Sequence, residues 1–255
     1  MAIQGGMGDN LWVGGYDLSG DIGSLGQIAC PRGVLDTTPI NVWAYRRILG
    51  RKDGAIDFTS FFNPSAGAAH PVLSALPTTD VSVAYCRGTS LGSPAACVIG
   101  KQIDYVPAEG ADGSLTFTTN VQASGYGLEW GNLHTAGIRT DVGATSPATG
   151  VDGRAASLYG LQAYLHVFEI TGTDATIKLQ ESSAVDGGGD AFADIVGGGF
   201  TALTGASDHT TQRIKTANDL AVERYIRVVT TTAAGFTSLS FGVIVVRNVY
   251  GNETF

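Results

Sequence analysis

The side chains that could support catalysis or metal binding are few and widely separated in this chain. The four histidines form no His-x-x-x-His pair, and the three cysteines form no Cys-x-x-Cys pair. Zinc sites commonly take their ligands from such short spacings. These observations predict a protein that is not an enzyme and has neither a metal nor another cofactor, although a zinc site assembled from distant residues stays open. The residues are His70, His134, His166 and His209, with Cys30, Cys86 and Cys97.

Two other groups of residues could form a binding site. Asp186, Asp190 and Asp194 surround three consecutive glycines, and loop carboxylates of this kind can bind calcium. We interpret this segment instead as an acidic hairpin turn. Trp12, Trp43 and Trp130 could form a sugar-binding surface, but Trp43 is expected at a packing position. Both alternatives, a calcium loop and a carbohydrate site, are kept as hypotheses.

A repeated phrase gives the clearest indication of the fold. Residues 53–59 read Asp-Gly-Ala-Ile-Asp-Phe-Thr, and residues 112–118 read Asp-Gly-Ser-Leu-Thr-Phe-Thr. Asp-Gly is typical of turns that need a positive φ, and the alternation that follows is typical of a half-buried strand. Many further short alternating segments are separated by glycine-rich turns. The sequence therefore predicts a mainly β fold, a β-sandwich or barrel with one short flanking helix.

The flanking helix is expected over residues 39–49. Thr38-Pro39 resembles a helix start, and Val42, Tyr45 and Ile48 recur at helical spacing before Gly50. A basic cluster follows the same segment. It could be a solvated helix face that balances the helix dipole, or it could pair with acidic loops of a neighbouring subunit. The cluster consists of Arg46, Arg47, Arg51 and Lys52.

Length and charge limit the remaining possibilities. The chain has 255 residues and a formal net charge of −8, whereas proteins that grip DNA are normally basic. An acidic surface is nevertheless compatible with DNA that must slide past without sticking. The cysteines are expected to be free thiols in a reducing compartment. No apolar run has the length of a membrane span, and residues 1–10 do not resemble a signal peptide.

The domain organisation is predicted from a change in sequence character near Gly150. Residues 1–150 are expected to form one domain. Residues 151–255 show strand signals every ten to twelve residues, which is typical of a β-sandwich. They are expected to form a second, C-terminal β-sandwich region, or to complete the first domain. A long glycine- and threonine-rich loop is expected over residues 131–157.

Two stretches carry a resemblance to a known family. Residues 34–64 are expected to contain, in order, a strand with an Asp, a short helix, the turn Arg51-Lys52-Asp53-Gly54 and a strand that ends in Phe62-Asn63-Pro64. In this order they resemble the major tail tube proteins of long-tailed bacteriophages. Residues 104–125 are similar to a later strand of that family. Thr38-Pro39 and Arg51 depart from the family pattern, and residues after Gly150 lie outside the match.

The resemblance implies a structural virion protein of the phage tail. Its subunits would form stacked hexameric rings around a lumen through which genomic DNA passes without sequence-specific binding. Its partners would be further copies of itself and other tail proteins, with assembly in the bacterial host cytoplasm and no membrane insertion. Physically, such rings need strand edges that pair between subunits and loops that become ordered on stacking. Candidate loops are the glycine-rich N-terminal region and residues 63–80 and 131–157.

Specific residues follow from this interpretation. Acidic side chains near the repeated phrases are candidates for the lumen face: Asp53, Asp57, Asp104, Asp112 and Glu129. Candidates for inter-subunit contacts are the basic cluster and two aromatic residues: Arg46, Arg47, Arg51, Lys52, Phe61 and Phe62. The alternatives are a capsid decoration or other virion β-sandwich protein, and a carbohydrate-binding module. The first would bind a capsid lattice without forming tubes, and the second would retain glycans through tryptophan.

Overall fold

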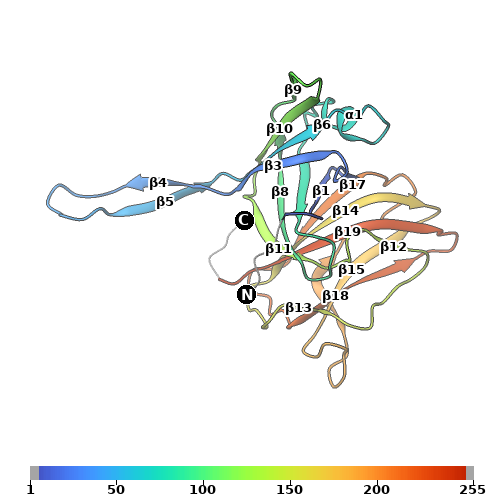
Figure 1. The fold of residues 1–255 in the computed structure, drawn as a ribbon. Coiled ribbons are helices and arrows are strands. Elements are labelled where there is room, and N and C mark those ends of the chain that lie inside the picture. Colours follow the sequence, from blue (N-terminus) through green and yellow to red (C-terminus); the bar gives the residue numbers. More distant parts are fainter. Residues whose placement is uncertain (1–5, 251–255) are drawn as a thin grey trace. The chain divides into compact units, whose positions relative to one another are not determined.

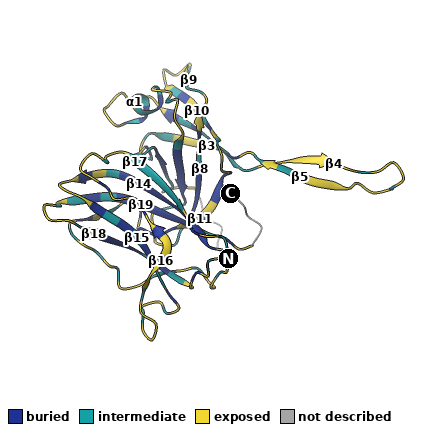
Figure 2. Ribbon diagram, turned by 180° about the vertical axis from the view of Figure 1, so that it is seen from behind, coloured by how far each residue is buried: buried dark blue, intermediate teal, exposed yellow. Residues whose placement is uncertain are grey.

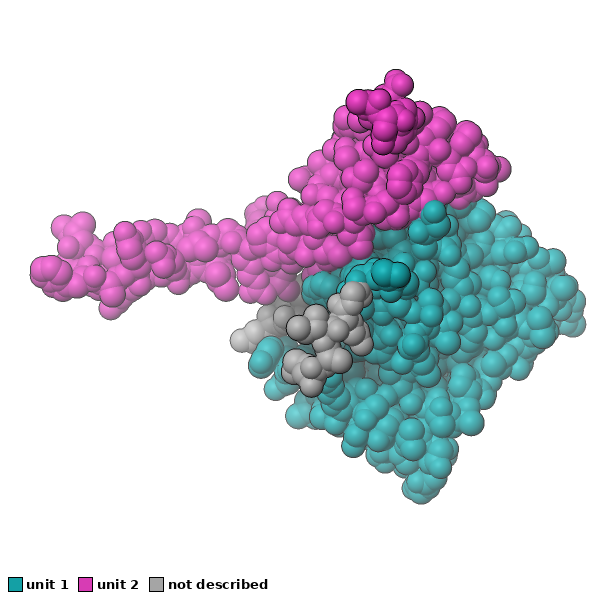
Figure 3. All heavy atoms as spheres, in the orientation of Figure 1, with its two compact units in different colours: residues 1–20, 84–97, 129–254 teal, residues 21–83, 98–128, 255 magenta. Residues whose placement is uncertain are grey.

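The computed structural model describes residues 6–250, which form antiparallel sheets and one short helix. This confirms the predicted mainly β fold class. Packing divides the chain into two compact units, coloured separately in Figure 3. Of the described residues, unit 1 comprises 6–20, 84–97 and 129–250, and unit 2 comprises 21–83 and 98–128. No helix within the described residues is long and apolar enough to cross a membrane.

The elements are labelled in Figure 1. Those of unit 1 are β1 (Asn10–Val13), β2 (Tyr16–Asp17), β11 (Glu129–Leu133), β12 (Arg139–Asp141), β13 (Val151–Asp152), β14 (Leu161–Thr171), β15 (Ala175–Ser182), β16 (Ala193–Gly199), β17 (Thr210–Lys215), β18 (Tyr225–Thr232) and β19 (Ser238–Arg247). Those of unit 2 are β3 (Ile22–Ala29), β4 (Arg32–Asp36), β5 (Arg47–Lys52), β6 (Ala55–Phe61), α1 (Ala69–Leu73), β9 (Val106–Glu109) and β10 (Leu115–Ala123). Strands β7 (Val81–Cys86) and β8 (Pro94–Gln102) have residues in both units.

Unit 1 is a β-sandwich with one continuous hydrophobic core. One sheet has the strand order β17-β14-β19-β11, and β11 pairs with the first residues of β8. The other sheet has the order β13-β18-β15-β16. Alternate residues point inward, because successive side chains of a strand face opposite sides of the sheet. The buried sets include Leu161, Ala163, Leu165 and Val167 on β14, Ala175, Ile177 and Leu179 on β15, and Leu239, Phe241, Val243 and Val245 on β19.

Unit 2 brings the two repeated phrases into one sheet. The first phrase continues into β6 and the second into β10, and these strands pair side by side with Phe117 opposite Ser60 and Thr119 opposite Phe58. The apolar members Ile56, Phe58 and Phe117 are buried, as the alternation predicts. Strand β3 pairs with the other edge of β6, and β9 pairs with β10.

The two Asp-Gly turns need glycine for different reasons. Gly113 has a φ of +82°, the conformation expected for such a turn. Gly54 is not among the residues with positive φ, but a Cβ there would lie 2.3 Å from the backbone nitrogen of Leu128. The first turn therefore requires glycine because another backbone segment of unit 2 approaches it closely.

The helix predicted over residues 39–49 is wrong. Residues 37–46 contain turns and irregular backbone, and β5 begins at Arg47. A short helix needs an apolar face packed against other elements to be stable. Val42 is only partly buried, while Tyr45 and Ile48 are exposed, so the helical spacing has no surface to bury against. The short helix lies instead at α1, within the loop expected over residues 63–80.

Packing divides the chain at several places rather than once near Gly150. Strand β13 starts at Val151 and pairs with β18, and Thr145 forms a bridge to Thr230, so residues on both sides of Gly150 belong to the unit 1 sandwich. The loop predicted over residues 131–157 contains the end of β11 together with β12 and β13. The candidate N-terminal loop falls partly outside the described residues, which begin at residue 6.

Candidate self-association surface

Strands β4 and β5 form a two-stranded hairpin, which we call the arm (residues 32–52). The register places Val34 opposite Leu49 and Leu35 opposite Ile48. Within unit 2, the arm extends away from β3, β6 and β10 (Figure 1). Its strands are mostly exposed (Figure 2). A two-stranded ribbon by itself is only marginally stable in water, so an arm of this kind gains stability from a surface to pack against.

The arm presents an unusual amount of apolar surface to solvent. At its tip, the exposures of Ile40 and Trp43 are 107% and 105%, which means that these side chains have essentially no packing contacts within the chain. Further exposed apolar side chains follow along both strands: Val34, Leu35, Tyr45, Ile48 and Leu49. A high density of exposed apolar side chains is typical of sites of protein association.

Local hydrogen bonds hold the base of the tip. The Asp36 carboxylate accepts hydrogen bonds from the backbone nitrogen of Thr38 at 2.9 Å and from its hydroxyl at 2.6 Å. These bonds stabilise the ionised form and lower the pKa of Asp36. The Arg46 nitrogen in turn donates to the Thr38 hydroxyl at 2.7 Å. Polar bonds of this kind shape the tip without burying any of its apolar side chains.

Charge distinguishes the arm from the rest of the chain. Residues 32–52 contain five basic side chains and one acidic side chain, whereas all other residues together contain ten basic and 22 acidic ones. Among the described residues, no ion pair joins Arg46, Arg47 or Arg51 to a carboxylate. Two whole copies both carry a net negative charge and repel each other. The positively charged arm of one copy would instead be attracted to the acidic remainder of another copy.

The predicted inter-subunit residues lie in two places within unit 2. Arg46, Arg47, Arg51 and Lys52 all belong to the arm, so the interpretation of a solvated helix face is wrong because no helix is present. Phe61 and Phe62 lie at the end of β6 and are exposed, and the Phe62 ring packs 4.4 Å from the His70 ring. Their role in contacts between subunits stays a prediction.

Four of the predicted lumen acids lie in unit 2, and the structure brings two of them together. The side-chain amide of Asn120 donates to Asp57, and its backbone nitrogen donates to Asp104 at 2.6 Å. Partial burial raises the pKa of Asp57, and the nearby Asp104 charge adds to this effect. Asp53 is exposed after β5, and Asp112 is exposed in the turn before β10, where it accepts hydrogen bonds from Ser114.

Glu129 requires a correction. Its side chain is buried in unit 1, where it forms an ion pair with Arg213 at 3.0 Å and accepts a hydrogen bond from the Tyr164 hydroxyl. A carboxylate enclosed in this way does not face a water-filled lumen. No local sequence pattern indicates this pair, because Glu129 and Arg213 are far apart along the chain.

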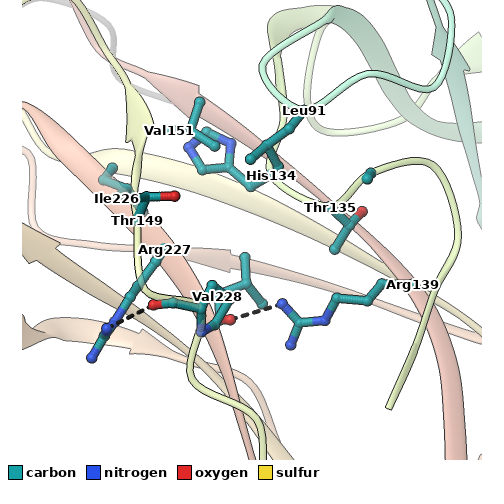
Figure 4. A pocket seen from close by; sticks show the side chains of 11 residues that line it. Leu91, His134, Thr135, Arg139, Thr149, Val151, Ile226, Arg227 and Val228 are labelled. Carbon is teal, nitrogen blue, oxygen red and sulfur yellow. Dashed lines mark hydrogen bonds between the residues drawn. The ribbon is translucent and has the colours of Figure 1, made fainter. Parts of the chain in front are cut away.

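A cavity of about 170 Å³ lies in unit 1, between the β11–β12 connection, residues 147–151 and β18 (Figure 4). Apolar side chains provide much of its lining: Leu91, Val151, Ile226 and Val228. Two guanidinium groups also border it but donate to protein oxygens, Arg139 to the Val228 carbonyl at 2.9 Å and Arg227 to the Pro147 carbonyl at 2.7 Å.

His134 borders the same cavity and is buried. Its Nδ1 donates to the carbonyl of Asn132 at 3.0 Å, and burial lowers its pKa to about 4. The ring is therefore neutral at physiological pH. The cavity offers a predominantly apolar surface without a fixed charge that would be free to bind an ion.

The described residues contain no group of three or more potential metal ligands. Asp186 and Asp190 accept hydrogen bonds from backbone nitrogens in their own loop, and Asp194 pairs with Lys178 at 2.7 Å, which is the pattern of an acidic turn. The tryptophans do not all face solvent, because Trp12 is buried while Trp43 and Trp130 are exposed.

Residues 88–92 read Gly-Thr-Ser-Leu-Gly, a spacing found around the nucleophile of many hydrolases. That motif functions at a sharp turn from a strand into a helix. Here the five residues connect β7 to its hydrogen-bonded neighbour β8. Among the described residues, no side-chain hydrogen bond joins Ser90 to a histidine. The spacing is therefore present without the structural context that gives it a catalytic role.

Comparisons with known proteins give only distant similarities. No family model matches the chain, and no curated protein matches it. One similar structure is a crystal structure of the Dit protein of phage SPP1, described as a paradigm of the hub adsorption apparatus in phages that infect Gram-positive bacteria. Its sequence is 14% identical to this chain, and the TM-score is 0.34. The alignment spans 94% of this chain and 99% of the Dit chain. Two structures of the phage p2 baseplate in its activated conformation, with strontium and with calcium, are each 8% identical.

The alignments with these two baseplate chains span 95% and 96% of this chain and 99% and 100% of the baseplate chains. Their TM-scores are 0.35 and 0.34. TM-scores in this range do not establish a shared fold.

Proposed function

We propose that this chain is a structural subunit of a bacteriophage tail that assembles by self-association through the arm. The observation that carries the proposal is the arm itself, a hairpin whose exposed apolar side chains lie on both strands and are not covered by any described residue. The sequence stretches that resemble tail tube proteins, residues 34–64 and 104–125, correspond to the arm and to strands β6 and β10 of unit 2.

In the more specific form of this proposal, the subunits form hexameric rings that stack into a tube. The arm of one subunit packs on its neighbour, which relieves the exposure of Leu35, Ile48 and Leu49. The exposed strands of the arm also have backbone groups that can add to a sheet edge of another copy. Genomic DNA passes through the lumen, and Asp53, Asp57, Asp104 and Asp112 are the candidate side chains that keep its wall acidic.

A second candidate is a ring at the hub or baseplate of a tail rather than a repeating tube. The observation that favours it is the extent of unit 1, whose sandwich is built largely from residues after Gly150, outside the stretch that resembles tail tube proteins. Such a subunit is expected to form single rings. Capsid decoration and glycan binding remain alternatives that predict neither rings nor tubes.

Negative-stain electron microscopy and sedimentation velocity of the concentrated protein test the proposal. We expect rings, stacked as tubes if the tube assignment holds and single if the hub assignment holds. Ile48→Asp places a charge opposite the exposed Leu35 of the arm and is expected to leave monomers. Val196→Asp is the matched control, since Val196 is also exposed and apolar but lies on β16 in unit 1.

Assembly of the control together with loss of assembly in Ile48→Asp would support the arm as the interface. Rings formed equally by both variants would exclude this role of the arm. A wild-type chain that stays monomeric at every concentration would count against self-association altogether, and retention on a capsid lattice or a glycan column would then favour one of the alternatives.

A further inference from the structure

The tip of the arm carries one aromatic ring that none of the described residues covers. Trp43 is fully exposed, whereas the nearby Tyr45 ring already has the guanidinium of Arg47 stacked 4.5 Å from its centre. An indole exposed at the end of a hairpin is costly to keep in water, and buried tryptophans are frequent anchors of protein interfaces. Trp43 is therefore the side chain of the arm that burial in an apolar site elsewhere would stabilise most.

The cavity of unit 1 has the chemistry of such a site. Its lining side chains Leu91, Val151, Ile226 and Val228 are apolar, and it lies within unit 1 alone. The two guanidinium groups at its border are already engaged. Arg139 also pairs with Asp141 at 2.7 Å, and Arg227 also donates to Gln180 at 2.7 Å. An ionic ligand would have to compete with these bonds, while an apolar group would not.

The size of the cavity limits its occupant. A cavity of about 150 Å³ with apolar walls can hold a benzene molecule. The cavity here has a volume of about 170 Å³, which suits one aromatic side chain inserted from outside. The rim is accessible, because Leu91 and Thr149 are exposed.

Charge complementarity indicates where such a side chain would come from. The arm has a net charge of +4, with Arg46 and Arg47 close to Trp43 in the sequence, while the described residues of unit 1 contain nine basic and 14 acidic side chains. A basic hairpin that ends in an indole is thus attracted to the unit that contains the cavity. A second copy of the chain supplies both partners in equal number, so that each copy can donate one arm and accept another.

We propose that Trp43 of one copy inserts into the cavity of unit 1 in a neighbouring copy, next to His134, Val151 and Val228. This inference rests on the proposed function, since both require self-association, but it assigns the docking site of the arm tip. A chain of such contacts is head-to-tail, and a head-to-tail contact closes into a ring when the rotation between neighbours permits it.

Photocrosslinking tests the contact directly in the full-length chain. Trp43 is replaced by benzoylphenylalanine, and the protein is mixed with a copy labelled with ¹⁵N, so that crosslinks between copies can be recognised by mass. We expect crosslinked peptides that contain residues 134–151 or 226–228. Crosslinks confined to other segments would overturn the assignment.

Variants on each side of the contact provide a second readout. Trp43→Ala and the cavity-filling Thr149→Trp are each expected to raise the dissociation constant of self-association at least tenfold. Trp43→Phe retains an aromatic ring and is expected to raise this constant less than Trp43→Ala does. The matched controls are Ile40→Ala, equally exposed at the tip, and Val142→Trp, exposed in unit 1 outside the cavity lining. Both controls are expected to stay within about threefold of wild type.

The two proposals can fail separately. If Ile48→Asp abolishes assembly but Trp43→Ala and Thr149→Trp associate like wild type, the arm is an interface and the cavity is not its docking site. If the wild-type chain never associates, both proposals are wrong. Circular dichroism of each variant at the concentration used establishes that a loss of association does not come from unfolding.

Discussion

Arg213 donates hydrogen bonds from one nitrogen to both carboxylate oxygens of Glu129, at 3.0 and 3.1 Å, inside unit 1. The exposures of the two side chains are only 6% and 3%. Tyr164 donates its hydroxyl to the same carboxylate. These residues come from β17, β11 and β14, so the polar cluster links three strands of one sheet at fixed register. A buried ion pair of this kind contributes only modestly to the free energy of unfolding. Removing one partner lowers the free energy of unfolding strongly, because the other charge then stays buried without compensation.

Loss of one partner should therefore destabilise the chain strongly. We expect Glu129→Ala to lower the free energy of unfolding by about 3–5 kcal/mol, because the Arg213 charge stays buried without its carboxylate. Urea denaturation measures the change. The exposed pair Arg224–Asp152 is the control, and Asp152→Ala is expected to change the free energy of unfolding far less than Glu129→Ala, because water screens an exposed ion pair. Equal losses in the two variants would show that the Glu129 pair is not buried as described.

Acid should destabilise unit 1 through His134. Its pKa in the folded chain is lowered to about 4 by burial, whereas a histidine in an unfolded chain titrates near about 6.5. Below about pH 6.5 the unfolded state gains a proton that the folded state does not bind, so stability falls as the pH decreases toward 4. We expect the contribution of His134 to this loss between pH 7.5 and 5 to be about 2 kcal/mol.

His134→Asn removes this titration. The variant is expected to be less stable than wild type at pH 7.5 but to lose about 2 kcal/mol less on acidification. Urea denaturation at both pH values gives the comparison, and other titrating groups cancel because they are shared. An unchanged pH dependence in the variant would mean that His134 is not held neutral by burial.

Gly54→Ala tests the close approach of two backbone segments in unit 2. The added Cβ would lie 2.3 Å from the Leu128 nitrogen, so the backbone must shift. Overpacking of this kind typically costs about 1–3 kcal/mol. Gly33→Ala is the control, because nothing lies within 4 Å of a Cβ at that position. Thermal unfolding of both variants measures the difference, and a Gly54→Ala chain as stable as the control would contradict the described packing.

The sequence predicted the strands well where a period of two coincides with burial on one face. The strand signals of residues 151–255 correspond to strands that include β14 and β19, whose alternate residues fill the unit 1 core. The repeated phrases likewise predicted β6 and β10. Local alternation is sufficient to predict these strands, because each strand buries one face regardless of which strand pairs with it.

The sequence failed where the outcome depends on distant residues or on another molecule. Val42, Tyr45 and Ile48 have helical spacing, but spacing cannot show whether a surface exists for them to pack on, and within the described residues Tyr45 and Ile48 stay exposed. Glu129 resembled a surface acid because its partner Arg213 lies far along the sequence. The cavity that Leu91, Val151 and Val228 line also depends on segments that only the fold brings together.

Shortening the arm should separate assembly from folding. Replacing residues 38–45 with Asn-Gly, a favoured two-residue hairpin turn, joins the ends of the arm where the Thr37 nitrogen donates to the Arg46 carbonyl at 2.9 Å. The segment removed contains Ile40, Trp43 and Tyr45, all exposed, so the free energy of unfolding is expected to change by less than about 0.5 kcal/mol.

Self-association of this shortened chain is expected to be lost or weakened at least tenfold, because the apolar tip is the part that a neighbour would bury. Urea denaturation and sedimentation velocity on the same preparation measure the two quantities. A shortened chain that unfolds more easily would show that the tip stabilises its own subunit. One that still forms rings like wild type would place the interface on the strands of the arm or on another surface, and the exposure of Trp43 would then have no role in assembly.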